Sequence, residues 1–181
     1  KQRRRCTSTG TVVRLAALGL LGASAGLMED TGSTWGAIYL DRQFEVIPFV
    51  AGMAFVGLQG AQLIGRFTGD ALVSRIGPRF AVVQGGIIAF LGMGLSLIWP
   101  SPTTAILGFA CVGWGVATAI PSAMHAADEL PDMNHGDGLM IVTWMMRIGF
   151  FAGPPLIGSL SEATDLRLAL WVVPAFAVVI L

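Results

Sequence analysis

The chain has 181 residues and no net charge, and 54% of its residues are hydrophobic while only 12% are charged. An ordinary soluble domain carries about 25% charged residues, so this composition excludes most soluble classes. Zero net charge also removes the overall field that would attract nucleic acid. Cys6 lies in a basic tail and Cys111 in an apolar run, so we expect no disulfide and no metal site, and nothing predicts a cofactor.

Apolar runs long enough to cross a bilayer recur along the chain, since a helical span needs roughly 20 such residues. They predict six transmembrane helices, at about residues 11–40, 46–72, 79–99, 103–124, 138–160 and, cut off by the chain end, from 166 onward. We therefore expect a basic tail at 1–10 and an all-α, six-helix membrane domain at 11–181. Because the chain starts with Lys1 and stops at Leu181 inside an apolar run, we expect it to be a fragment.

A short charged hinge at 65–79 separates the second and third apolar runs, and it reads Gly-Arg-Phe-Thr-Gly-Asp-Ala-Leu-Val-Ser-Arg-Ile-Gly-Pro-Arg. Gly77 can adopt a left-handed backbone, and Pro78 suits the first turn of a following helix because its missing N–H costs nothing there. These residues predict a tight helix-to-helix turn at a membrane face.

Basic residues are distributed unequally between the two ends of the predicted spans. The tail side carries six (Lys1, Arg3, Arg4, Arg5, Arg75 and Arg79), and the opposite side carries two (Arg42 and Arg167). By the positive-inside bias, the tail, the hinge and the acidic connection at 125–137 are cytoplasmic.

Three charged residues lie near the middle of predicted spans: Glu29 and Asp30 in the first, followed by Trp35, and Arg147 in the fifth. A charge at the bilayer centre costs about 2.5 to 3.5 kcal/mol on insertion scales, so such a residue normally faces a partner or a wet cavity. One interpretation is a structural ion pair between the first and fifth spans. The other is a proton site or substrate ligand at the midplane, with Arg147 tuning the carboxylate. Their spacing does not say which acid faces a cavity.

The second span carries a polar stripe whose members lie at offsets of 3, 7 and 11 residues, namely Gln59, Gln62, Arg66 and Asp70. Those offsets place them on one helix face, which must contact protein or water rather than lipid. The stripe is either polar contact between helices or the lining of a cavity. Arg66 and Asp70, four residues apart near the cytoplasmic end, look more like a gate or clamp. In the fourth span, Thr118 and Ser122 are expected to bond to preceding backbone carbonyls, and His125 to be solvated.

The hinge resembles the cytoplasmic loop signature of the major facilitator superfamily, Gly-x-x-x-Asp-Arg-x-Gly-Arg-Arg. Arg75, Gly77 and Arg79 match it, whereas Asp70 and Ser74 stand where the pattern has Gly and Asp, and Pro78 replaces the first residue of the final basic pair. The Gly-Pro-rich stretch 149–155 is similar to the glycine-proline motif of a fifth helix. Glu29-Asp30-x-x-x-x-Trp35, Gly-Arg-x-x-Gly-Asp at 65–70 and Ala-Ala-Asp-Glu-Leu-Pro at 126–131 resemble bacterial fucose-permease-like proteins.

This resemblance implies the C-terminal six-helix half of a twelve-helix inner-membrane permease. Such a permease moves a small solute, a sugar or an exported metabolite or drug, by alternating access driven by protons or ions. The missing partner would be the N-terminal half of the same chain. The first, second, fourth and fifth helices of this half would line the cavity, and Arg75 or Arg79 would pair with Asp128 or Glu129 at a cytoplasmic gate.

Two other functional classes are the alternatives. A non-transporting sensor or scaffold could share the fold. A membrane enzyme would need a reactive cluster at a membrane face, but His125 and His135 are the only histidines, and their loop contains no Asp-x-x-x-Asp or His-x-x-x-His spacing. We therefore expect no enzyme. Neither the direction of transport nor the coupling ion follows from the sequence.

Overall fold

The computed structural model describes residues 9–130, 133 and 136–181. The tail predicted at 1–10 lies outside the described residues, apart from Thr9 and Gly10, which begin the first helix. The described chain is all α-helical, as predicted, and five of its helices are long and apolar enough to cross a membrane. The helices are α1 (Thr9–Phe44), α2 (Pro48–Ile76), α3 (Pro78–Ile98), α4 (Pro102–Asp128), α5 (Asp137–Ala163), α6 (Leu166–Ala169) and α7 (Val172–Ile180).

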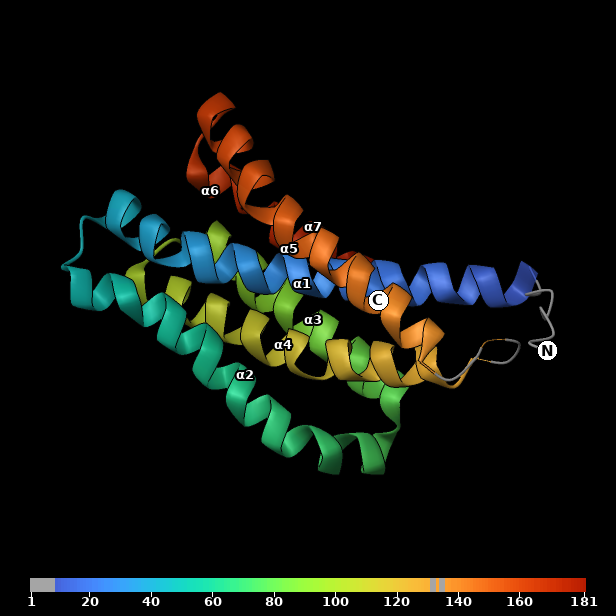
Figure 1. Ribbon diagram of the computed structural model, residues 1–181. Coiled ribbons are helices and arrows are strands. Elements are labelled where there is room, and N and C mark those ends of the chain that lie inside the picture. The colour runs from blue at the N-terminus through green and yellow to red at the C-terminus, as the bar shows by residue number, and fades with distance from the viewer. Residues whose placement is uncertain (1–8, 131–132, 134–135) are drawn as a thin grey trace.

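The long helices pack into one bundle, in which α2 and α5 are inclined to α1 (Figure 1). α1 packs against α5 on one side and against α4 and α2 on the other, while α3 and α7 pack against α4 and α1 respectively and against each other. The α2–α3 hinge, the end of α4 and the start of α5 lie at the same end of the bundle as the start of α1. The α1–α2 turn lies at the opposite end, so the predicted alternation of the connections is confirmed.

The hinge is shorter than predicted. Residues 65–76 continue α2, and only Gly77, with φ of +83°, separates α2 from α3, which starts at Pro78. The predicted left-handed glycine and helix-starting proline are therefore confirmed, but the charged stretch before them is helical. The turn predicted at 41–45 is also mostly helical, because α1 runs to Phe44, and α4 carries the start of the predicted 125–137 connection as far as Asp128.

Glycines let helix backbones touch at several crossings. Gly149 of α5 lies against the backbone of Ala23 in α1, and Gly85 of α3 lies against the backbone of Gly115 in α4. Lipid tails are as apolar as leucine, so helices associate in a bilayer by close packing rather than by hydrophobic exclusion. Many of the glycines inside the apolar runs are thus packing positions of the bundle, although an added methyl group at Gly52, Gly60 or Gly94 would meet nothing within 4 Å.

Arg167 joins two parts of the chain that are distant in sequence. From the start of α6, its Nε and one Nη donate hydrogen bonds of 2.8 and 2.6 Å to the carbonyl oxygen of Leu97, and the same Nη donates at 3.3 Å to that of Ile98. These carbonyls belong to the last turn of α3, where no intrahelical N–H is available. A cation there also complements the negative end of the helix dipole.

Replacing Arg167 with alanine should destabilise the protein by about 2 kcal/mol, because charged hydrogen bonds to otherwise unpaired carbonyls are lost. For a chain of this size, the loss should lower the melting temperature in detergent by about 5 °C. Arg167→Lys should recover only part of the loss, since lysine lacks the planar fork. Arg42→Ala, at an exposed position, is the control. Equal melting temperatures for both alanine variants would refute the role of Arg167.

Candidate functional site

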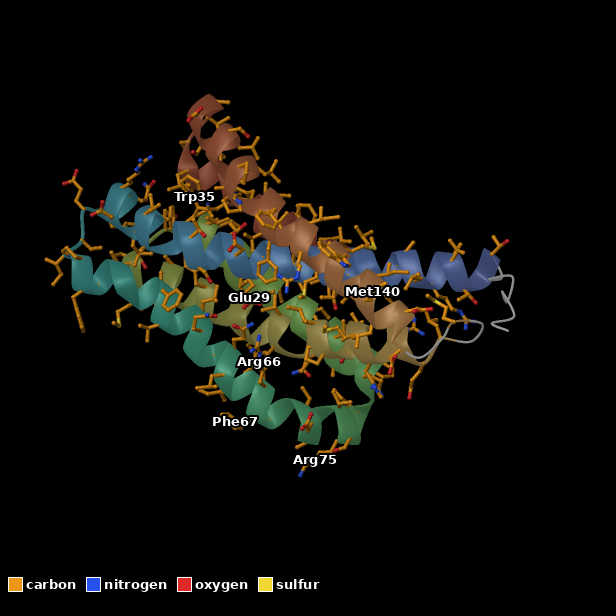
Figure 2. All side chains as sticks on the ribbon, in the orientation of Figure 1. Glu29, Trp35, Arg66, Phe67, Arg75 and Met140 are labelled. Carbon is orange, nitrogen blue, oxygen red and sulfur yellow. The ribbon has the colours of Figure 1, made fainter. Side chains whose placement is uncertain are left out.

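Glu29 and Asp30 lie in the middle of α1, and both are half-buried. Figure 2 labels Glu29 on α1, near the centre of the bundle. Within the described residues, neither carboxylate forms a hydrogen bond or an ion pair. Arg147 is exposed on α5 and pairs with neither of them. The structural ion pair between the first and fifth spans is therefore not formed in this structure.

The two acids occupy different surroundings. Asp30 lies in a cavity of about 410 Å³ between α1 and α5, together with Phe150, Phe151, Pro154 and Pro155. Glu29 does not line that cavity. The structure thus distinguishes Asp30 from Glu29, although the spacing of polar residues in the sequence did not show which of the two faces a cavity. An unpaired carboxylate at mid-span can bind a proton or a cation, because either one neutralises a charge that is costly at this depth.

The polar stripe of α2 divides into two parts. Gln62 is 3% exposed, and its Nε2 has no hydrogen-bond partner among the described residues, as is also true of Gln59 Oε1. Arg66 and Asp70 are exposed, one and two turns farther along. Buried amide groups without partners are costly, so Gln59 and Gln62 have hydrogen-bonding capacity to offer a solute or water.

Arg66 and Asp70 lie in a groove of about 380 Å³ between the last turns of α2 and α4. Thr118, Ser122 and His125 of α4 line the same groove. The hydroxyls of Thr118 and Ser122 make no hydrogen bond within the described residues, so the predicted bonds to their own helix are absent and both are available to the groove. The groove therefore contains the charged side chains of Arg66 and Asp70 and the hydroxyl groups of Thr118 and Ser122, at the predicted cytoplasmic end.

The remaining residues of the predicted gate lie at the same end of the bundle. Arg75 and Arg79 are exposed on either side of the Gly77 turn, and Figure 2 places Arg75 at that end of α2. The side chain of Asp128 accepts a hydrogen bond of 2.8 Å from the backbone N–H of Gly136. Glu129 Oε1 lies 3.5 Å from Nε2 of His125, which is exposed as predicted. The proposed pairing of these arginines with the acids stays a prediction.

Three buried groups on α1 form a polar row that sequence reasoning recognised only in part. Thr31 Oγ1, Trp35 Nε1 and Tyr39 OH have no hydrogen-bond partner among the described residues. They are four residues apart and therefore share a helix face, a spacing that could have revealed them. The ring of Trp35 lies beside Gly158 of α5, and Thr31 Oγ1 lies beside Gly153, so the row follows the α1–α5 contact.

The described residues contain no group of three or more His, Cys, Asp or Glu side chains that could hold a metal ion. The candidate site residues that they do contain lie mostly on α1, α2, α4 and α5, around the middle and one end of an apolar bundle. Separate carboxylates, amides and hydroxyls of this kind can bind a proton or a polar solute through hydrogen bonds.

Comparisons with known proteins agree with this arrangement. The sequence model described as Major Facilitator Superfamily matches residues 9–181. The chain is 29% identical to the membrane protein MosC of Rhizobium meliloti over 92% of its own length and 41% of that protein. It is 28% identical to an uncharacterized transporter of Sinorhizobium fredii over 90% of its length and 43% of that protein. It is also 27% identical to an uncharacterized MFS-type transporter of Yersinia pestis, over 79% of its length and 37% of that protein.

The chain thus spans about two fifths of the length of these curated relatives. The family match covers nearly the whole chain, including every helix from α1 to α7. The chain therefore belongs to the major facilitator superfamily, a family of multi-pass membrane transporters rather than enzymes.

Proposed function

We propose that this chain is the C-terminal half of a bacterial inner-membrane permease that moves a small solute by proton-coupled alternating access. The observation that carries the proposal is the pair of half-buried, unpaired carboxylates at the middle of α1. A bundle that served only as a scaffold would have little reason to retain them, because each costs a few kcal/mol at this depth. Glu29 and Asp30 are the proposed sites for proton and solute.

Other polar residues complete the proposed pathway. Trp35, Gln59, Gln62 and Arg147 would contact the solute near the midplane, and the buried amides of α2 have unused hydrogen-bonding capacity. The chain's share of its relatives' length supports the assignment to a half, and the degenerate loop signature at 70–79 favours the C-terminal one. The N-terminal half would supply the other wall. A resemblance to the fucose-permease group favours a small polar solute.

Gradient-driven uptake tests this proposal. The full-length protein would be reconstituted in liposomes and offered a panel of radiolabelled sugars, organic acids and amines, with and without a pH gradient. Accumulation of at least one solute that collapses when the gradient is dissipated is the expected result. A protein that carries no solute under either condition would favour the sensor or scaffold alternative.

The cytoplasmic gate yields a separate prediction. Arg75 or Arg79 would pair with Asp128 or Glu129 when the cytoplasmic side closes, and these ion pairs would hold that state, with Arg66 and Asp70 acting as a clamp on α2. Replacing Asp128 with Asn and Glu129 with Gln together should weaken closure and raise the labelling rate of a cysteine at Ser122 by about tenfold, equivalent to about 1.4 kcal/mol.

The measurement uses a membrane-impermeant thiol reagent applied from the cytoplasmic side. Glu162→Gln, an exposed position at the other end of α5, is the control. An unchanged labelling rate in the Asp128/Glu129 variant would remove these two acids from the gate.

A further inference from the structure

The cavity around Asp30 has a distinctive chemical lining. One wall is the Asp30 carboxylate of α1, and the others are the rings of Phe150 and Phe151 and the two prolines of α5. The Phe150 ring reaches α1 where Gly26 has no side chain to obstruct it. Phe151 is 82% exposed on this chain. The cavity therefore combines one negative charge with two aromatic rings.

The prolines add a second feature. α5 remains helical through Pro154 and Pro155. Because proline has no N–H, the carbonyl oxygens of Phe150 and Phe151 cannot receive the usual hydrogen bond from the residue four positions later. Inside a membrane helix, carbonyl oxygens that lack this bond need a hydrogen bond from a side chain, a neighbouring helix or a water molecule.

The carboxylate and the two rings in this lining favour positive charge. The Asp30 carboxylate carries negative charge, and aromatic faces attract cations through their quadrupoles. Among the described residues no basic side chain lines the cavity; Arg147 lies one turn before Phe151 on α5 but is not part of the lining. The cavity is largely open to the surface, and its volume of about 410 Å³ exceeds what a bare metal ion needs.

We propose that this cavity binds the ammonium group of an organic cation, a protonated amine or a quaternary ammonium compound, as the transported solute. This inference rests on the proposed transport function and narrows its substrate class. A bulky, weakly hydrated ammonium group suits aromatic walls better than Na⁺, which would have to lose its water. Asp30 would hold either a proton or the solute, so loading one releases the other, and the two would be exchanged across the membrane.

Calorimetric binding to the full-length protein in nanodiscs tests this inference. The probes are choline and tetraethylammonium, and the neutral control is dimethylbutanol, the carbon isostere of choline. Saturable binding of at least one ammonium probe is expected, with choline at least about tenfold tighter than its isostere if choline is the one that binds. If neither choline nor tetraethylammonium binds, the inference is overturned. If, in addition, Na⁺ binds in a way that depends on Asp30, the site is a metal-ion site instead.

Two variants separate the charge from the aromatic contribution. Asp30→Asn keeps the side-chain shape and should abolish the preference for the cation. Phe151→Leu keeps an apolar side chain without a π face and should weaken ammonium binding by about fivefold. Asp41→Asn, at an exposed position near the end of α1, should bind like the parent protein. Equal affinity in all three variants would contradict the site.

Failure of the ammonium-binding proposal can be distinguished from failure of the proposed transport function. If the reconstituted protein accumulates a neutral solute in response to a pH gradient but binds neither ammonium, the substrate class is wrong and proton-coupled transport stands. If it accumulates no solute at all, the transport proposal itself is wrong.

Discussion

Replacing Gly149 with alanine should destabilise the folded bundle by about 3 kcal/mol, although alanine is the better helix former. A methyl group at this position would lie 2.8 and 2.9 Å from the carbonyl carbon and Cα of Ala23 in α1. These are backbone atoms, so the clash can be relieved only by moving α1 away from α5. That contact runs along much of both helices and carries the Asp30 cavity.

The measurement is the fraction of monodisperse protein after heating in detergent, together with the yield from the membrane. Gly60→Ala in α2 is the matched control, because an added methyl group there would meet nothing within 4 Å. We expect that control to keep or gain stability, by up to about 1 kcal/mol. If Gly149→Ala were as stable as Gly60→Ala, the close α1–α5 contact would be wrong.

Neutralising Glu29 and Asp30 together, as Glu29→Gln and Asp30→Asn, should reduce proton-driven solute accumulation to the level of protein-free liposomes. The reason is that no other described acidic side chain lies midway along a membrane-spanning helix. Both substitutions keep side-chain shape and remove a buried charge, so the fold should tolerate them and stability should not fall. The single variants should identify which carboxylate carries the proton.

The control for this pair is Asp41→Asn with Glu45→Gln, two exposed acids at the end of α1 and in the turn that follows. That variant should transport at the parental rate. Retained proton-driven accumulation in the Glu29/Asp30 variant, with normal protein levels, would mean that the coupling site lies elsewhere.

The parts of the fold that follow from local chemistry were predictable from sequence. The apolar runs predicted the approximate bounds of the five long helices, and Gly77 with Pro78 located the α2–α3 turn. The sixth expected span is instead divided into the short helices α6 and α7. The charged stretch before the α2–α3 turn was predicted only in part. Arg66 and Asp70 were correctly placed on one face of the second helix, but α2 continues beyond the expected end at 72 to Ile76, because charged residues four apart are compatible with a helix that ends at a membrane face.

The candidate site was harder to predict from the sequence, because it depends on which faces of the helices contact each other. Glu29 and Asp30 could be selected by their depth, but only the packing of α5 on α1 places Asp30 beside Phe150 and Phe151. Arg167 resembled an ordinary loop arginine, and its role depends on Leu97, 70 residues earlier. Contacts at such separation leave no trace in the local pattern of either segment.

Alternating access is the central claim, and paired cysteine labelling of the full-length protein tests it most directly. Native Cys6 and Cys111 would be replaced with serine, and cysteines placed at Thr34, exposed on the half of α1 away from the predicted cytoplasmic end, and at Ser122 in the α2–α4 groove. Attaching a bulky maleimide at position 122 from the cytoplasmic side should hold that side open. We predict that labelling at position 34 from the outside then slows at least about tenfold. Unchanged labelling at position 34 would mean that the two sides open independently, and the account of a rocking transporter half would be contradicted.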